Sequence, residues 1–265
     1  MSTAAQFSGT VPATYDRILG PVLFGPYARD VVGRLPGGDG LRVLEIACGT
    51  GIVTRRMQEA LSGRATIVAT DLNEPMVEHA RQAVASPEIT WQQADAQSLP
   101  FADGSLDVVV CQFGYMFLPD KVQGLRESRR VLAPGGTLIA NIWTSLDANP
   151  FAQAMHDALA FGFPDDPPRF LETPYGYEED RVRMDMTAAG WEDVRFETLE
   201  FESPCPSASH FARGFSHGSP LTHELIARGT DLEEATEMLA RAVIPVGGEQ
   251  PFTAKLSAFV ITAAR

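Results

Sequence analysis

An apolar run that ends in a glycine-rich turn constrains this chain more than any other feature. Residues 43–51 read Val-Leu-Glu-Ile-Ala-Cys-Gly-Thr-Gly, and the segment 52–61 has the pattern of a helix. A strand that enters a helix through glycines is how α/β proteins bring backbone close to an adenine nucleotide or a similar ligand. We therefore expect an α/β fold with a ligand site at Gly49 and Gly51, where a Cβ atom would obstruct the approach.

Two common nucleotide motifs are absent from this turn. The dinucleotide fingerprint has a third glycine three residues after Gly51, where this chain has Thr54. The Gly-Lys-Ser/Thr triplet of a phosphate-binding P-loop does not follow either. The turn therefore matches neither of these two phosphate-binding motifs.

Strand and helix patterns alternate through the middle of the chain. We expect strands at 42–47, 64–71, 89–93, 107–113 and 137–143, and helices at 51–62, 75–85 and 121–132. Pro134-Gly135-Gly136 should end the last of these helices. Apolar strands at regular intervals, joined by helices, predict a parallel sheet that is covered on both faces.

The flanking regions have a different pattern. We expect helices at 151–159, 177–189 and through most of 207–243, and strands at 194–201 and 257–263. The N-terminal segment 7–34, the proline-rich loop 164–174 and the helices of 207–243 should gather over the carboxyl ends of the strands. Their aromatic side chains should either close an apolar pocket or form a satellite core, and they are Phe24, Phe161, Phe163, Phe170, Phe211 and Phe215.

Net charge and cysteine content limit the classes of binding partner and of cysteine site that we expect. The net charge of −13 disfavours nucleic-acid backbones and anionic membranes. Cys48, Cys111 and Cys205 are an odd number without Cys-x-x-Cys spacing, which favours buried, reduced cysteines over a disulfide framework or a zinc site. Because we find no signal-peptide pattern and no apolar segment of about 20 residues, we expect a cytoplasmic protein.

The expected strand ends place a consistent set of residues at one edge of the sheet, where open α/β sheets bind ligands. Asp71, twenty residues after Gly51, is placed to accept both hydroxyls of a ribose. Asp95 would accept from an adenine amino group, while the backbone N–H of Ala96 donates to a ring nitrogen. Ordinary capping and turn roles are the alternative for both aspartates.

Three more residues at this edge have two possible roles each. Leu72 and Met76 would either flank an adenine or belong to the core. Glu45 should face the glycine turn, where it would order the turn or bind a ligand amino group through water.

Four motifs in this order closely resemble class I S-adenosylmethionine-dependent methyltransferases. They are 45–51 (Glu-Ile-Ala-Cys-Gly-Thr-Gly), Asp71, 95–109 (Asp-Ala-Gln-Ser-Leu-Pro-Phe-Ala-Asp-Gly-Ser-Leu-Asp-Val-Val) and 130–136 (Arg-Val-Leu-Ala-Pro-Gly-Gly). The chain looks most similar to the small-molecule group that includes the ubiquinone/menaquinone C-methyltransferases, over about residues 40–143. The resemblance implies a Rossmann-like, mostly parallel, seven-stranded α/β sheet with a terminal antiparallel hairpin, to which the chain adds helical cap or lid elements.

The resemblance also implies S-adenosyl-L-methionine as methyl donor and S-adenosyl-L-homocysteine as product. The ammonium of this cofactor suits carbonyls near Ala47 and Cys111, and its carboxylate suits a donor such as Tyr15. Gln112 would lie near the methyl group. Ordinary aromatic packing is the alternative role for Tyr15. The turn residues Cys48, Gly49 and Gly51 complete the expected cofactor site.

We therefore expect an enzyme that transfers a methyl group to a small, partly apolar molecule by direct in-line displacement. The expected organisation is a helical lid segment at 1–36, a cofactor-binding core at 37–146, and the rest of the sheet with helical acceptor-site insertions at 147–265. An NAD(P)-dependent oxidoreductase and a non-catalytic S-adenosylmethionine-binding module are the alternatives. We expect no metal, and the oligomeric state stays open, with a homodimer as one option.

A general base is needed only if the acceptor arrives protonated. The candidates in the variable regions are Tyr115, His156, Tyr175, Tyr177, His210 and His217. None of them is assigned as catalytic, and a lone histidine on such helices is more often a packing or surface residue. The helical segment 207–243 is longer than the plain connection of the family, so the acceptor of a relative cannot be carried over.

Overall fold

A seven-stranded sheet organises the chain, and the computed structural model describes residues 11–265. Its strands are β1 (Leu41–Ile46), β2 (Ala65–Asp71), β3 (Ile89–Gln93), β4 (Leu106–Gln112), β5 (Leu132–Trp143), β6 (Val194–Cys205) and β7 (Phe252–Ala264). They lie in the order β3-β2-β1-β4-β5-β7-β6. Strands β1 to β5 are parallel, and β7 runs antiparallel between β5 and β6. The predicted Rossmann-like sheet with a terminal antiparallel hairpin is confirmed.

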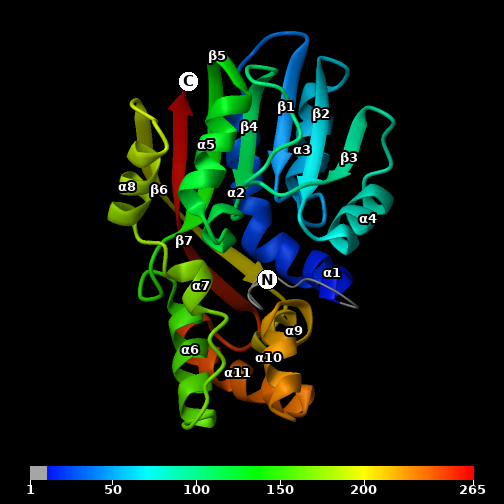
Figure 1. Ribbon diagram of the computed structural model, residues 1–265. Helices are drawn as coiled ribbons and strands as arrows, with labels where there is room; N and C mark the ends of the chain where they lie inside the picture. Colours follow the sequence, from blue (N-terminus) through cyan, green and yellow to red (C-terminus); the bar gives the residue numbers. More distant parts are fainter. Residues whose placement is uncertain (1–10) are drawn as a thin grey trace.

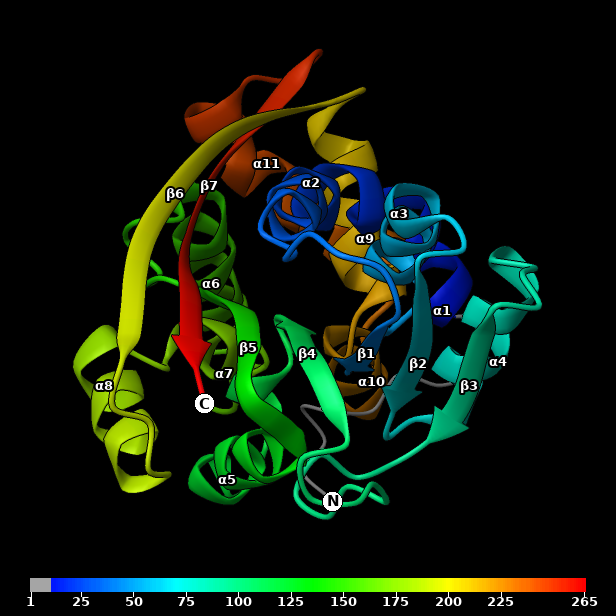
Figure 2. The ribbon, with the colours of Figure 1, turned by 90° about the horizontal axis from the view of Figure 1, so that it is seen from above.

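Helices cover both faces of the sheet and gather beyond one end of it. They are α1 (Val11–Thr14), η2 (Tyr15–Phe24), α2 (Gly25–Gly33), α3 (Ile52–Leu61), α4 (Glu74–Ala83), η3 (Tyr115–Phe117), α5 (Lys121–Val131), α6 (Pro150–Gly162), α7 (Glu172–Tyr175), α8 (Glu179–Ala188), α9 (Ala208–Gly218), α10 (Leu221–Ala227) and α11 (Leu232–Gly247). Helices α2 and α3 pack on one face, and α5 and α8 on the other (Figure 2). Helices α6, α7, α9, α10 and α11 lie together beyond the end where the parallel strands finish (Figure 1).

The central strand β4 shows why the sheet is covered twice. Val108, Val109 and Val110 are all fully buried. Side chains of a strand point alternately to its two faces, so Val108 and Val110 join the core beneath α2 and α3, while Val109 joins the core on the α5 side. Full burial of one such side chain stabilises the fold by about 1.5–3 kcal/mol.

The hairpin of β6 and β7 is longer than its sequence pattern indicates. Pairing between these strands runs from Val194 opposite Ala263 to Cys205 opposite Phe252. Strand β5 pairs only with the later part of β7, from residue 258 onward. The first half of β7 therefore leaves the sheet beside β6 and holds α9, α10 and α11 beyond the strand ends (Figure 1).

The sequence predicts that Pro134-Gly135-Gly136 separates a helix from a strand. In the structure, this segment instead lies within β5. Helix α5 ends at Val131, and β5 begins at the next residue. Leu106 pairs with Leu132, but Val108 pairs with Thr137, so residues 133–136 form an irregularity within the strand. Proline and glycine are tolerated there because a bulge leaves ladder positions unpaired.

The N-terminal helices pack against α9. Segment η2 is a π-helical stretch, in which the Gly25 N–H donates to the Gly20 carbonyl five residues earlier. Such stretches are rare and are often found at functional sites. Positions 7–10 of the predicted N-terminal cover lie outside the described residues. Within residues 11–265, no helix is long and apolar enough to cross a bilayer.

Close contact between η2 and α9 generates a test of this packing. A Cβ atom on Gly214 of α9 would lie 2.5 Å from Leu19 Cδ2 and 2.8 Å from Ile18 Cγ2, and both partners are buried. We expect Gly214→Ala to lower the free energy of unfolding by about 1–3 kcal/mol, as overpacking does. Urea denaturation measures this change.

Gly33→Ala is the matched control. Gly33 lies in α2, and apart from its chain neighbours and the backbone of that helix, no described atom lies within 4 Å of the position of its Cβ. Alanine there should be neutral or stabilise by up to about 1 kcal/mol. Equal effects of the two substitutions would contradict the close packing of η2 on α9.

Candidate active site

A cavity of about 230 Å³ lies at the carboxyl ends of β1, β2, β3 and β4. The four strand ends that the sequence brings together all contribute to its wall. The residues that line it are Tyr15, Ile46, Ala47, Gly49, Asp71, Leu72, Asn73, Met76, Ala94, Asp95, Ala96, Gln97, Gln112, Phe113, Gly114, Phe117, Leu118 and Pro119. Nine of the predicted site residues are among them, namely Tyr15, Ala47, Gly49, Asp71, Leu72, Met76, Asp95, Ala96 and Gln112.

Asp71, at the end of β2, joins two backbone segments of the cavity wall. One carboxylate oxygen accepts a hydrogen bond from Gly49 N–H at 3.0 Å, and the other accepts from Asn73 N–H at 2.8 Å. Burial raises the pKa of Asp71, and these backbone hydrogen bonds act in the opposite direction. The Asn73 side-chain amide also donates to Oδ1 at 3.3 Å, whereas Oδ2 has a further lone pair with which Asp71 can accept from a ligand in the cavity.

The far side of the cavity combines a second carboxylate with apolar side chains. Asp95 follows β3 by two residues, and its Oδ1 accepts from Gln97 N–H at 2.8 Å. Leu72 and Met76 supply apolar wall beside it, and Met76 is buried. This side therefore offers a hydrogen-bond acceptor next to a surface that suits a flat apolar ring.

Two strand ends at the cavity have left-handed backbone at residues other than glycine. Ala47 after β1 has a φ of 55°, and Phe113 after β4 has a φ of 56°. Such backbone costs of order 1 kcal/mol per residue and is concentrated at functional sites. Gly114 follows Phe113, and a Cβ atom there would lie 2.6 Å from Ala47 Cβ and 2.7 Å from Cys111 Sγ. The sequence reasoning missed Gly114, although a glycine two residues beyond a strand end was a usable signal.

Gln112 and Tyr15 connect the sheet to the N-terminal helices at the cavity. Gln112 Nε2 donates to the Phe24 carbonyl of η2 at 3.0 Å. Its Oε1 is buried, with no hydrogen-bond partner among the described residues. Tyr15 stacks on Phe24 with ring centroids 4.9 Å apart. A ligand group that donates a hydrogen bond would satisfy the Gln112 oxygen.

Two predicted site residues of the first strand and turn point away from the cavity. Glu45 shares a strand face with Val43, on the side of α3, and its carboxyl group accepts a hydrogen bond from the Thr54 hydroxyl. Cys48 is buried in the same apolar cluster as Val43. Its hydrogen-bond partner lies in the first turn of α3, just after the glycine turn, and the role of Glu45 toward that turn or a ligand stays a prediction.

Gly51 and Cys111 also lie outside the lining. Gly51 is the N-cap of α3 with a φ of 82°, and a Cβ atom there would meet Ala80 and Val84 at 3.1–3.2 Å. It allows close packing of α3, not ligand approach. The Cys111 thiol points into the core on the α5 side. All three cysteines are buried and free.

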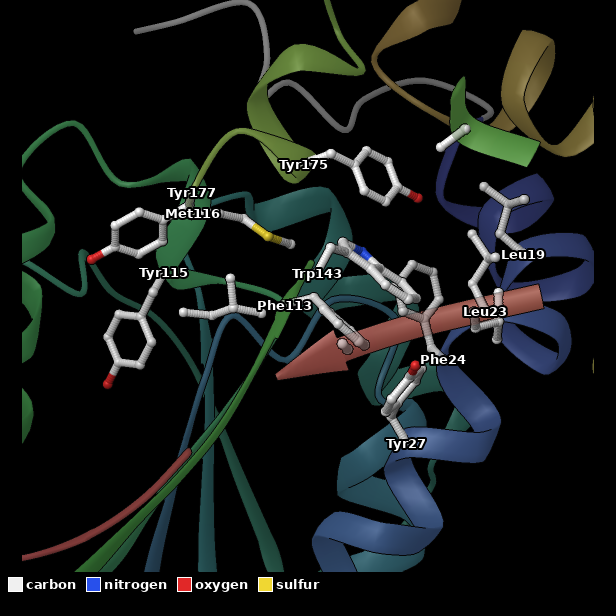
Figure 3. Close-up of a cluster of buried hydrophobic side chains, with 14 of the residues drawn as sticks. Leu19, Leu23, Phe24, Tyr27, Phe113, Tyr115, Met116, Trp143, Tyr175 and Tyr177 are labelled. Carbon is white, nitrogen blue, oxygen red and sulfur yellow. The ribbon is translucent and has the colours of Figure 1, made fainter. Parts of the chain in front are cut away.

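A second, narrower chamber of about 50 Å³ adjoins the first cavity. It shares Tyr15, Phe113 and Phe117 with that cavity. Its full lining is Tyr15, Leu19, Leu23, Phe24, Phe113, Met116, Phe117, Trp143, Phe170, Leu171, Pro174, Tyr175, Phe215 and Ser219. Figure 3 shows part of this cluster, and Phe113 stacks on Trp143 with centroids 4.0 Å apart. We call it the aromatic chamber.

The aromatic chamber is where the three predicted covering segments meet. It takes residues from η2, from the 170–175 region and from α9, which confirms this expectation for the described part of the chain. The prediction was wrong for Phe161, which is 90% exposed at the end of α6. Phe211 packs against Phe151 and Phe252 in the core and does not line the chamber.

The six candidate bases differ in whether they line the cavity or the aromatic chamber. Tyr115 forms a hydrogen bond with Ser128, and Tyr177 donates to Asp185. Neither of them lines the cavity or the aromatic chamber, and the same is true of His156, His210 and His217. Tyr175 alone among the six lies in the chamber wall.

A wider hollow of about 440 Å³ lies outside this region, between residues 119–122 and α8. Its polar groups pair with one another, since Tyr177 and Arg181 both contact Asp185. Over residues 11–265, no three acidic, histidine or cysteine side chains are grouped to hold a metal ion.

Burial of Glu45 generates a pH-dependent prediction. Burial, opposed by the Thr54 hydrogen bond, raises the pKa of Glu45 from about 4.5 to about 8. Between these pH values the unfolded chain ionises Glu45, whereas the folded protein keeps it protonated. The contribution of Glu45 to stability therefore falls as pH rises from about 4.5 to 8, by about 1.4 kcal/mol per pH unit at most.

Glu45→Gln removes this titration and keeps an acceptor for Thr54. Urea unfolding of both proteins should be measured at pH 5, 6, 7 and 8. As pH rises, the free energy of unfolding of the variant should increase by about 1–2 kcal/mol or more relative to that of the parent. Other titrating groups are common to both proteins and cancel. A difference that stays constant with pH would contradict the raised pKa.

Comparison with known proteins agrees with this site. Residues 43–136 match a family described as a methyltransferase domain. The chain is 30% identical over 218 residues to the ubiquinone/menaquinone biosynthesis C-methyltransferase of Ectopseudomonas mendocina, a match that covers 74% of this chain and 83% of that enzyme. It is 35% identical over 125 residues to the demethylmenaquinone methyltransferase of Staphylococcus aureus, covering 47% of this chain and 51% of the relative.

A solved structure shows the same fold. Phosphoethanolamine N-methyltransferase 2 of Haemonchus contortus, in complex with phosphomonomethylethanolamine and S-adenosylhomocysteine, superposes with a TM-score of 0.62 at 15% identity. The match covers 96% of this chain and 57% of that protein. The matched methyltransferase domain contains the β1, β2, β3 and β4 ends of the cavity, and the first relative extends the similarity over most of both chains. This chain therefore belongs to the class I S-adenosylmethionine-dependent methyltransferases that methylate small molecules.

Proposed function

We propose that the 230 Å³ cavity holds S-adenosylmethionine and that the aromatic chamber receives the methyl acceptor. The observation that carries this proposal is the charge of the cavity. Its described lining contains the carboxylates of Asp71 and Asp95 but no lysine, arginine or histidine. A pyrophosphate would meet two carboxylates there without a cation, whereas adenosine hydroxyl and amino groups and an ammonium would find acceptors.

The residues present fit each part of this cofactor. Asp71 would accept from the ribose hydroxyls, and Asp95 from the adenine amino group, with Leu72 and Met76 beside the ring. The position of a Cβ on Gly49 is open space among the described residues, so the backbone there can approach a ligand closely.

The methionine end would lie toward Tyr15 and Gln112, where the cavity meets the aromatic chamber. The buried Oε1 of Gln112 has no other partner among residues 11–265, and it suits the ammonium group. The carbonyl of Ala47 is a second candidate acceptor at the same strand ends, as predicted from the sequence.

S-adenosylmethionine supplies an electrophilic methyl group that an acceptor displaces in line. The chain contributes position and exclusion of water. Tyr15, Phe113 and Phe117 stand between the two spaces, so an acceptor in the chamber would face the methyl-bearing end of the cavity. Holding two reactants in a productive arrangement can supply about 7–11 kcal/mol of the barrier reduction.

The aromatic chamber also limits the size, polarity and protonation state of the acceptor. The aromatic chamber has an apolar lining, which suits a small and partly apolar molecule. Its two tyrosines are poor bases, because burial raises the pKa values of Tyr15 and Tyr175 well above their ordinary range. The acceptor should therefore arrive in its reactive form. A cytoplasmic location and the exclusion of nucleic acid stay predictions from charge and sequence, as does the division at residues 36 and 146.

Cofactor choice is the first test of this proposal. Calorimetry should detect binding of S-adenosylmethionine and S-adenosylhomocysteine, and no binding of NAD. The Gly49 N–H of the turn, a donor that a pyrophosphate would use, already donates to Asp71, and Thr54 replaces the third glycine of the dinucleotide motif. Heat from NAD, with none from either sulfur ligand, would contradict the proposal.

Asp71→Ala tests the ribose contact. Loss of hydrogen bonds to a charged group should weaken S-adenosylhomocysteine binding by about 1.5–3 kcal/mol. Gly49 and Asn73 also lose a backbone partner, so stability should fall, and circular dichroism must show a folded variant at the temperature of the titration.

Asp107→Ala is the control for this loss of stability. Asp107 pairs with Arg42 at the start of β4, at the end of the sheet opposite the cavity. Its removal should leave the dissociation constant of S-adenosylhomocysteine unchanged. An unchanged constant in Asp71→Ala would exclude the ribose role.

A further inference from the structure

One tyrosine hydroxyl in the wall of the aromatic chamber has no hydrogen-bond partner among the described residues. Tyr175 lies at the end of α7 with 5% exposure, and its Oη forms no hydrogen bond within residues 11–265. Figure 3 shows this hydroxyl pointing from α7 toward the side of η2 that carries Leu19 and Leu23. The oxygen is not among the closed-off polar atoms of residues 11–265, so a molecule in the chamber can reach it and form a hydrogen bond.

The other tyrosines of the chain lack this feature. Tyr27 donates to the Leu199 carbonyl at 3.1 Å. Tyr115 pairs with a serine at 2.6 Å, and Tyr177 donates to an aspartate at 2.9 Å. Tyr15 also has an interaction partner. The open hydroxyl of Tyr175 is therefore specific to the chamber, which indicates a partner that enters from outside.

Trp143 supplies a second open donor in the same wall. Its ring centroid lies 5.8 Å from that of Tyr175. Its indole N–H donates to no group in the described part of the chain, whereas the Trp191 indole donates to the Leu125 carbonyl at 3.2 Å. An indole N–H can only donate, so the missing partner is a hydrogen-bond acceptor.

The chamber is also uncharged. Among the described residues, its lining includes no aspartate, glutamate, lysine, arginine or histidine. A charged group in it would be buried without a counter-charge, at a cost of several kcal/mol. The Phe113 and Trp143 rings stack at 4.0 Å, and with Phe24 and Tyr175 they present flat apolar surfaces.

We propose that Tyr175, supported by Trp143, determines which acceptor binds: an uncharged, ring-sized group with an oxygen that accepts a hydrogen bond from the Tyr175 hydroxyl. This inference rests on the proposed function, because the chamber receives an acceptor only if the adjoining cavity holds the methyl donor. Tyr175 acts here as a specificity residue and takes no proton.

The aromatic chamber is too small to accept a ring without a movement of its wall. At about 50 Å³ it is smaller than the roughly 150 Å³ cavity that accommodates benzene. An acceptor ring must therefore displace part of the wall. Helix α7 has only four residues and follows a proline-rich loop, so it is the wall segment with the fewest constraints from its own helix. Its movement would bring Tyr175 onto the ring that enters.

Matched bicyclic probes test this inference on the full chain saturated with S-adenosylhomocysteine. The probes are 1-indanone, which has a carbonyl, indane, which lacks it, and indane-2-carboxylate, which is charged. Calorimetry should show 1-indanone binding several-fold more tightly than indane, since one hydrogen bond changes affinity by about fivefold to tenfold. The carboxylate should bind at least about tenfold more weakly than 1-indanone.

Tyr175→Phe should lower 1-indanone affinity by about fivefold to tenfold and leave indane affinity unchanged. Tyr177→Phe is the matched control, because its hydroxyl contacts Asp185 outside the chamber, and it should change neither affinity. S-adenosylhomocysteine binding should be the same in all three proteins, which also shows that each variant folds.

Three results would overturn the inference while S-adenosylhomocysteine still binds. They are equal 1-indanone affinity in the parent and in Tyr175→Phe, carboxylate binding as tight as that of 1-indanone, and no binding of any probe. Failure of the parent to bind S-adenosylhomocysteine would instead overturn the proposed function, so the two failures are distinct.

Discussion

The buried Asp71 carboxylate is the contact on which the cavity depends. It joins the glycine turn after β1 to the start of α4, through backbone N–H groups of Gly49 and Asn73. Without this bridge, two backbone groups at the carboxyl edge of the sheet would lack a partner, and the turn would lose its fixed place. The same carboxylate faces the cavity, so a single group both shapes the site and offers hydrogen-bond acceptors to a ligand.

Charge divides the site into two parts. The cavity is acidic, with Asp71 and Asp95, whereas the aromatic chamber next to it has no charged side chain within the described residues. An electrophilic, positively charged cofactor and an uncharged acceptor are the pair that this division suits. The long β6–β7 hairpin makes the arrangement possible, since it holds α9 to α11 beyond the strand ends, where they face η2.

Much of this architecture could be predicted from the sequence, because local signals and tertiary structure agree there. The apolar, β-branched run at 108–110 is central strand in the structure, and β3 has the expected bounds, Ile89–Gln93. The long hairpin was underestimated because residues 202–205 of β6, Glu-Ser-Pro-Cys, include a proline and have no apolar–polar alternation, and β7 alone pairs with them. No local pattern indicates that a register jump would absorb Pro134-Gly135-Gly136 into β5.

The candidate site was predictable to a similar degree. Residues at strand ends, such as Asp71 and Asp95, follow from topology alone. The direction of Glu45 depends on which face of β1 it occupies, and one residue of register reverses that face. Tyr175 was one of six equal candidates, since its position depends on how α7 packs against η3 and against Trp143 of β5.

A crystal structure with S-adenosylhomocysteine tests the central claim most directly. The account predicts ribose hydroxyls at the Asp71 carboxylate, the adenine between Asp95 and Met76, and the sulfur beside Gln112, directed at the aromatic chamber. Density for the ligand outside the cavity, or with its sulfur directed away from Tyr15 and the chamber, would contradict it.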